Sequence, residues 1–132
     1  MKKLKQILMK KKSLKNLQLA PLRIPTGWKI INNNFYDISP DMEYFIDGIP
    51  NGDSWELFTQ DLLQLQHDHY NLVLDLGWYP EADSKGNYKI VLLKKYDWEN
   101  PIRTIESINK DKTIKAINKL LSEISKNHGN LD

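Results

Sequence analysis

The stretch from residue 62 to residue 96, LLQLQHDHYNLVLDLGWYPEADSKGNYKIVLLKKY, decides the fold of this 132-residue chain. It holds three apolar runs separated by short polar segments rich in turn-forming residues. Two of the runs place apolar side chains on one face: Leu72, Leu74 and Leu76, and Tyr88, Ile90 and Leu92. Connections this short join antiparallel strands. The stretch therefore predicts a meander of strands over 62–66, 72–79 and 88–96.

The flanking segments extend this sheet. Residues 28–37 predict a first hairpin that turns at Asn32-Asn33-Asn34, because asparagine tolerates the backbone of tight turns. Residues 39–54 are rich in proline and glycine, which indicates loops. The segment that begins at Asp53 either opens one helical turn or leads straight into the next strand. Residues 102–108 predict a short final strand.

A helix is predicted over residues 111–126. Its apolar residues recur at helical spacing, with lysines on the opposite side: Ile114, Ile117, Leu120, Leu121 and Ile124. This apolar stripe must be covered, and one face of the sheet is the expected partner. The predicted class is α+β, an antiparallel sheet of four to six strands packed against a C-terminal helix. Residues 1–20 form a basic helix or arm, and residues 21–132 form a single domain.

The amino-acid composition indicates the cellular compartment of the protein. The chain has no cysteine, so it has no disulfide framework and nothing ties it to an oxidising compartment. The apolar run at residues 7–9 is too short for a signal peptide, and no stretch approaches the roughly 18 apolar residues of a membrane helix. We therefore expect a cytoplasmic protein that does not associate with membranes.

Charge is distributed very unevenly along the chain. Residues 1–24 carry eight lysine or arginine residues and no acid, whereas residues 25–132 have a net charge of −6. Between Ile30 and Ser84 there are 11 acidic residues and no lysine or arginine. Soluble surfaces usually intersperse both signs, so such a stretch creates a one-signed field that indicates a basic partner.

Three alternative functions compete with this interpretation. His67 and His69 are possible metal ligands of a small enzyme, although a third histidine nearby is missing. The lysine-rich N-terminus suits nucleic-acid phosphates, but the charge of the rest of the chain opposes that role. A structural oligomer is the third alternative. Because no nucleophile elbow, phosphate loop or dinucleotide fingerprint is present, we expect a non-enzymatic protein without a cofactor.

Aromatic residues next to acids give a second signal. Trp78-Tyr-Pro-Glu81 and Tyr96-Asp-Trp-Glu99 lie at predicted strand ends, where aromatic side chains are often partly exposed. Tryptophan and tyrosine dominate the energetics of protein interfaces. The two segments are therefore candidates for apolar contact with a partner.

In overall character, residues 25–126 resemble small bacterial immunity proteins of polymorphic toxin systems, including contact-dependent growth inhibition. The resemblance is carried by Thr26-Gly-Trp-Lys-Ile-Ile31, Asp75-Leu-Gly-Trp-Tyr-Pro80, Asp97-Trp-Glu-Asn-Pro101, the acidic middle and the closing helix. It implies a non-enzymatic cytoplasmic inhibitor that binds a cognate toxin, such as a basic nuclease domain. From their predicted positions in loops and at strand ends, we nominate these contact residues: Asp53, Glu56, Asp61, Asp68, Trp78, Tyr79, Glu81, Asp83 and Trp98.

Overall fold

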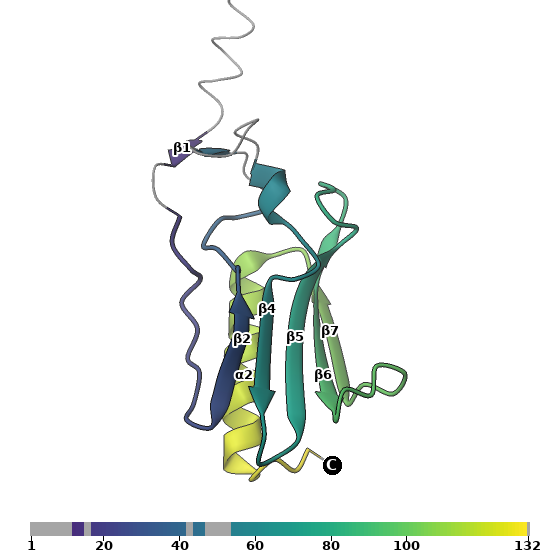
Figure 1. Ribbon diagram of the computed structural model, residues 1–132. Helices are drawn as coiled ribbons and strands as arrows, with labels where there is room; N and C mark the ends of the chain where they lie inside the picture. The colour runs from purple at the N-terminus through teal and green to yellow at the C-terminus, as the bar shows by residue number, and fades with distance from the viewer. Residues whose placement is uncertain (1–11, 15–16, 42–43, 47–53, 132) are drawn as a thin grey trace, which may run out of the picture.

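The computed structural model describes residues 12–14, 17–41, 44–46 and 54–131 (Figure 1). Its elements, in chain order, are β1 (Lys12–Leu14), β2 (Trp28–Asn33), β3 (Tyr44–Ile46), the short 3₁₀-helix η1 (Ser54–Leu57), β4 (Leu63–His67), β5 (Leu72–Tyr79), β6 (Asn87–Lys94), β7 (Arg103–Ser107) and α2 (Lys110–Lys126). These elements confirm the predicted α+β class.

The main sheet has five antiparallel strands in the order β2-β4-β5-β6-β7. From β4 to β7 each strand pairs with the next one in the chain, so the predicted meander is confirmed and includes the final short strand. The longest pairing joins β5 to β6, from Leu72 opposite Lys94 to Tyr79 opposite Asn87. A separate two-stranded sheet pairs β1 with β3 in parallel.

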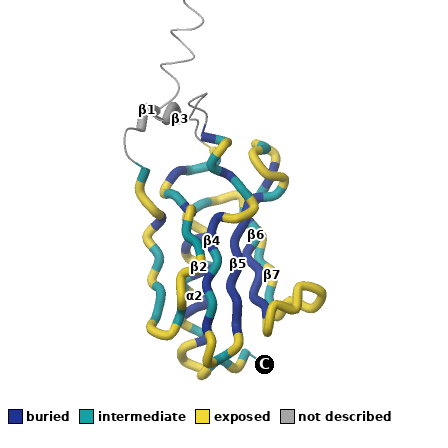
Figure 2. The backbone as a smooth tube through the Cα atoms, in the orientation of Figure 1, coloured by how far each residue is buried: buried dark blue, intermediate teal, exposed yellow. Residues whose placement is uncertain are grey.

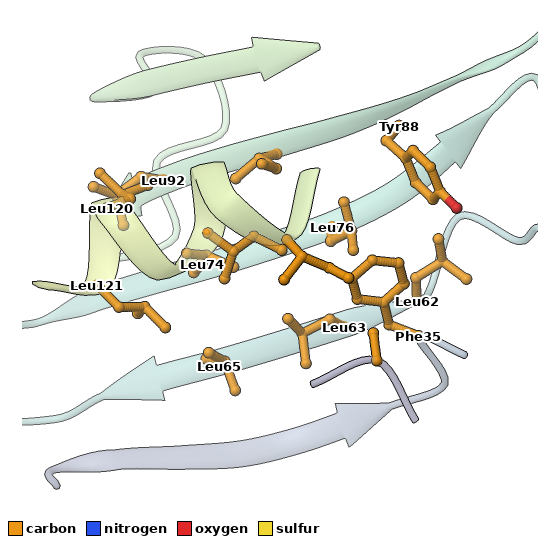
Figure 3. Packing of buried hydrophobic residues seen from close by; sticks show 14 of the residues in the cluster. Phe35, Leu62, Leu63, Leu65, Leu74, Leu76, Tyr88, Leu92, Leu120 and Leu121 are labelled. Atoms are coloured by element: carbon orange, nitrogen blue, oxygen red, sulfur yellow. The ribbon is translucent and has the colours of Figure 1, made fainter. Parts of the chain in front are cut away.

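The core lies between the sheet and α2, which stands behind the sheet in Figure 1. Figure 3 shows Leu74, Leu76 and Leu92 of the sheet directed toward Leu120 and Leu121 of the helix. These side chains are buried, and the whole of β5 is buried up to Trp78 (Figure 2). Each buried leucine contributes about 2 kcal/mol to folding through removal of apolar surface from water.

Both ends of α2 are capped by side chains or backbone groups that the sequence supplies. Asn109 Oδ1 accepts a hydrogen bond from the Lys112 N–H at 2.9 Å and caps the first turn. At the other end, the Gly129 N–H donates to the Ile124 carbonyl at 2.9 Å. Gly129 has a positive φ of 84°, and a Cβ there would lie 2.6 Å from the Tyr70 ring. Glycine is therefore required at this position.

The predicted first hairpin is wrong. β2 pairs with β4, and the chain leaves the sheet after Asn33 because the Phe35 side chain is buried in the core. The backbone of Phe35 instead accepts from the Ala20 N–H at 2.8 Å, so this segment pairs with the chain that precedes β2. β2 itself buries little apolar surface, since Ile30 and Ile31 are 55% and 50% exposed.

The expected helix or arm over residues 1–20 lies mostly outside the described residues. Where the N-terminal segment is described it is not helical: residues 12–14 form β1, and Leu19 makes an isolated bridge to Tyr36. These pairings with segments distant in sequence override the local helical spacing of the apolar residues. Among the described residues, no helix has the length and apolar character needed to cross a membrane.

Candidate protein-binding face

The sheet face opposite α2 is the candidate functional surface, and we call it the open face. No other described helix or strand covers it, and Figure 1 views it from the front. The strand registers place the following rows of side chains on it: Lys29, Gln66, Val73 and Leu93; Asn32, Gln64, Asp75, Val91 and Thr104; Gly77, Lys89 and Glu106; Tyr79 and Asn87.

An apolar patch lies at the centre of the open face. Val73, Val91 and Leu93 form a buried cluster of their own, separate from the core beneath α2. The glutamines of β4 and the exposed Thr104 and Glu106 of β7 surround this patch with polar groups. Val73 and Leu93 are 1% and 0% exposed, so this cluster stabilises the sheet and offers no apolar surface to a partner.

Asp75 stands out among the open-face residues because it is a carboxylate with only 7% of its surface exposed. Its Oδ2 accepts a hydrogen bond from Gln64 Nε2 at 3.1 Å. Burial raises the pKa of Asp75, and the negative charge of Asp61 raises it further, against the opposing effect of the Gln64 bond. Asp75 was not among the nominated residues. The alternation of β5 could have identified it, because Asp75 lies on the face opposite Leu74 and Leu76.

Asp61, Asp75 and Glu81 converge at one end of the open face, which we call the acidic end. All three carboxylates act on Tyr79: burial is the largest cause of its raised pKa, followed by the charges of Asp75, Asp61 and Glu81. The Lys89 ammonium lies 5.9 Å from the centre of the Tyr79 ring. Three nominated residues, Asp61, Tyr79 and Glu81, are thus brought together from two separate segments of the chain.

Close backbone packing builds the acidic end. Gly77 of β5 lies under the loop that precedes β4, and a Cβ at Gly77 would be 2.4 Å from the Gln60 carbonyl oxygen. Beside it, the Trp78 N–H donates to the Thr59 carbonyl at 2.8 Å. Glu81 Oε1 accepts from the Gln60 N–H at 3.2 Å. These contacts hold Asp61 and Glu81 beside the end of β5.

The opposite end of the open face is formed by the β6–β7 loop, residues 95–102, and by the turn between β4 and β5. The Tyr96 hydroxyl donates to Gln66 Oε1 at 3.0 Å, which ties the loop to the open face. Tyr96 is 45% exposed and Trp98 is 52% exposed. The expected exposure of these aromatic residues is confirmed. Nearby, Asp68 Oδ2 pairs with Lys29 Nζ at 2.5 Å.

The β6–β7 loop begins with a strained turn. The Asp97 N–H donates to the Lys94 carbonyl at 3.0 Å and closes a turn whose central residues, Lys95 and Tyr96, have φ values of 53° and 60°. Such left-handed turns favour asparagine and glycine, and other residues cost about 1–2 kcal/mol each there. The sequence carries no signal for this turn because neither preferred residue is present, so the strand predicted over 88–96 ends earlier, at Lys94.

Trp78 is buried, so the prediction that it contacts a partner is wrong. It is 1% exposed and packs edge to face against Tyr88 at 4.9 Å, with its indole N–H donating to the Asp83 carbonyl at 2.8 Å. A side chain enclosed in this way offers no surface to a partner. Strand alternation could have predicted this burial, because Trp78 lies two residues after Leu76 on the core-facing side of β5.

The remaining nominated residues are dispersed. Asp83 supports the β5–β6 turn, where its Oδ1 accepts from the Lys85 N–H at 2.8 Å. Glu56 lies exposed on η1. Asp53 lies outside the described residues, and Asp68 and Trp98 lie at the end of the open face opposite the acidic end.

His67 is placed as a packing residue. Its ring stacks on Tyr70 with centroids 4.1 Å apart, and its Nδ1 accepts from the Tyr70 N–H at 3.1 Å. On the other side, a Cβ at Gly27 would lie 2.5 Å from Nε2. His69 is exposed. The described part of the chain contains no group of three or more histidine, aspartate or glutamate side chains arranged to hold a metal ion.

Comparisons with protein-family models, with curated proteins and with solved structures found no match to this chain.

Proposed function

We propose that this protein is a cytoplasmic immunity protein that binds and neutralises a cognate toxin through the open face of its sheet. The observation that carries the proposal is the convergence of Asp61, Asp75 and Glu81 at the acidic end. Burial is the largest cause of the raised pKa of Tyr79, and the charges of Asp75, Asp61 and Glu81 raise it further. The three carboxylates together give this end of the face a negative potential. A basic protein surface is the partner that this potential attracts.

Long-range charge favours the same partner. The stretch from Ile30 to Ser84, which has no lysine or arginine, supplies all three carboxylates of the acidic end and also the turn that contains Asp68. Lys29 and Lys89 also lie on the open face, so the excess of negative charge is concentrated at the acidic end. Such a local excess steers an oppositely charged protein during diffusion and raises its association rate constant. Fast association suits an inhibitor that must reach a toxin before the toxin reaches its target.

The dimensions of the open face suit one protein partner. β5 has eight residues, so at about 3.3 Å per residue the face is about 26 Å long. A standard interface buries about 800 Å² on each side, which corresponds to a patch about 30 Å across. A single partner laid along β5 therefore reaches the acidic end and the β6–β7 loop at once.

A nuclease domain is the toxin class that this surface fits best. The active sites of nucleases must attract phosphate, so they carry positive potential. The carboxylates of the acidic end compete with phosphate for the same positively charged surface. In this proposal the protein itself catalyses nothing and inhibits by occupying or covering the basic surface of the toxin.

The test is affinity capture with tagged full-length protein from the bacterium that encodes it, at low and moderate salt, with identification by mass spectrometry. We expect one basic protein with toxin activity, recovered near 1:1 and inactivated by the complex. Recovery of nucleic acid alone, or of the tagged protein alone, would overturn the proposal.

A matched pair of variants then locates the surface. The double variant Asp61→Asn, Glu81→Gln removes two charges from the acidic end, and the glutamine keeps an oxygen that accepts from the Gln60 N–H. The control, Asp111→Asn with Glu123→Gln, removes two charges from α2 on the far side of the sheet. We expect the first variant to slow association and weaken its dependence on salt, and the control to behave as wild type. Equal effects of both would show that the open face is not the interface.

A further inference from the structure

The β6–β7 loop, residues 95–102, gathers several exposed apolar side chains. Seven large apolar residues of the described chain are exposed, and three of them belong to this loop: Tyr96, Trp98 and Ile102. Tryptophan offers the most apolar surface of any residue and is over-represented among interface hot spots. A tryptophan more than half exposed on a short loop is therefore a candidate anchor.

The loop is also held in a defined position. The turn at Lys95 and Tyr96 adopts the left-handed backbone that these residues disfavour. Two hydrogen bonds fix it against β4 and the β4–β5 turn: the Lys95 N–H donates to the Asn71 carbonyl at 2.9 Å, and the Tyr96 hydroxyl donates to Gln66. A strained backbone conformation persists where surrounding contacts hold it in place, and such conformations are concentrated at functional sites.

The charge of the loop indicates which kind of partner side chain binds to its aromatic rings. Residues 96–102 contain two carboxylates, Asp97 and Glu99, and no lysine or arginine. The two preceding lysines lie against the β4–β5 turn: Lys94 Nζ donates to the Tyr70 carbonyl at 3.1 Å, and Lys95 lines a groove that also contains Asp68. The aromatic part of the loop is thus acidic.

Arginine is the side chain that fits an exposed indole flanked by carboxylates. Its planar guanidinium stacks on an aromatic face and at the same time donates to a carboxylate in a fixed fork. The compact ammonium group of lysine is more strongly hydrated and lacks both features. Asp97 Oδ2 accepts a hydrogen bond from Asn100 Nδ2 at 3.3 Å, and a carboxylate with one such bond keeps further acceptor positions for a guanidinium.

We propose that Trp98, together with Tyr96, Asp97 and Glu99, receives an arginine side chain of the protein partner. This inference rests on the proposed function, since it assigns the partner's anchoring group at the end of the open face opposite the acidic end. The two ends of the open face then have different roles in binding. The acidic end sets the rate of association, and the β6–β7 loop sets the lifetime of the complex.

The site is tested first without the partner. The ¹⁵N-labelled protein is titrated with N-acetyl-arginine amide and, in parallel, with N-acetyl-lysine amide at equal ionic strength. The indole N–H resonance of Trp98 is identified by its loss in Trp98→Ala. We expect this resonance to shift with the arginine compound at millimolar concentrations and to stay in place with the lysine compound. No shift, or equal shifts with both compounds, would overturn the arginine site.

The second test uses the toxin captured by the wild-type protein. Trp98→Ala should raise the dissociation rate constant about thirtyfold or more, the size expected for an interface hot spot, with little change in association. Ile108→Ala is the matched control, because Ile108 is 71% exposed and lies outside the loop. A dissociation rate of Trp98→Ala within twofold of wild type would overturn this inference while the proposed function stands. If no toxin is captured, the proposed function fails, and the titration still decides whether the loop binds arginine.

Discussion

Asp75 on β5 and Gln64 on β4 meet across the open face, where the carboxylate accepts a hydrogen bond from the Gln64 amide at 3.1 Å. This single bond only partly offsets the removal of the carboxylate from water, so the pKa of Asp75 is raised above its ordinary value of 3.8. A carboxylate kept in an unfavourable position is expected where it serves binding at a cost in stability.

Asp75→Asn should stabilise the free protein at pH 7. Because the pKa of Asp75 is higher in the folded than in the unfolded state, the folded state binds more protons and the wild type loses stability as pH rises through the window above 3.8. Asparagine keeps an acceptor for Gln64 and removes the titration. Thermal unfolding from pH 3.5 to pH 8 should show a gain in Tm at neutral pH that vanishes below pH 4. A constant difference at all pH values would mean that the ionised carboxylate is not the source of the instability.

The same carboxylate links partner binding to pH. A cationic partner placed over the acidic end favours ionised Asp75 and lowers its pKa, so binding releases a proton. We expect affinity to increase as pH rises through the raised pKa of Asp75 in the free protein, and this dependence to disappear in Asp75→Asn. Calorimetric titration in two buffers of different ionisation enthalpy measures the proton released. Proton uptake would have the wrong sign for a cationic partner at this site.

His67 should make the fold sensitive to mild acid. Burial, with a contribution from the charge of His69, holds the pKa of His67 below 6.5, although Asp68 acts in the opposite direction. A histidine with a lowered pKa contributes stability above pH 6.5 that is lost as pH falls below it. Protonation also removes the Nδ1 acceptor of the Tyr70 N–H.

The variant His67→Asn isolates this effect, because Asn Oδ1 occupies the position of Nδ1 and still accepts a hydrogen bond. We expect it to be less stable by about 0.5–1.5 kcal/mol at pH 7.5 through the lost stacking on Tyr70, but less sensitive to pH between 5 and 7. The control His69→Asn, at an exposed site, should keep most of the wild-type pH slope. An unchanged slope in His67→Asn, measured by urea unfolding, would assign the sensitivity to other groups.

Truncation of Trp78 should destabilise the fold strongly, whereas truncation of Trp98 should leave the stability almost unchanged. Trp78→Ala removes a buried ring and leaves the Asp83 carbonyl without its indole donor, at a cost of about 3–5 kcal/mol in unfolding free energy. Trp98→Ala removes an exposed ring and should change stability by less than about 0.5 kcal/mol. Urea unfolding followed by circular dichroism measures both. A large loss of stability in Trp98→Ala would assign that residue a structural role.

Gly77→Ala should disrupt the acidic end by displacing the loop that precedes β4. The added methyl group meets the Gln60 carbonyl oxygen, a backbone atom that has little freedom to move, so we expect a loss of about 1–3 kcal/mol. The displaced loop also carries Asp61 away from Asp75, which should weaken toxin binding beyond the loss of folded protein. Binding measured at a temperature where the variant is fully folded separates the two effects. Wild-type affinity under those conditions would show that the position of Asp61 is not critical.

The regular elements could be predicted because their signals are local. Alternation over β5 and β6 and helical spacing over α2 depend only on residues a few positions apart, and each pattern has a single face to bury. The first hairpin could not be predicted correctly, because the asparagines after β2 suit either a turn or an exit from the sheet. Burial of Phe35 decided between them.

By itself, the sequence determined the strands from β4 to β7, the C-terminal helix that covers them and an acidic stretch without a basic residue. Tertiary structure alone decided which acids meet, because Asp61, Asp75 and Glu81 come together only when the loop before β4 packs on Gly77. It also decided that the loop carrying Trp98 begins with a left-handed turn and is tied to Gln66. Periodicity is a property of neighbours along the chain, whereas strand partners and surface clusters depend on which distant segments bury the most apolar surface together.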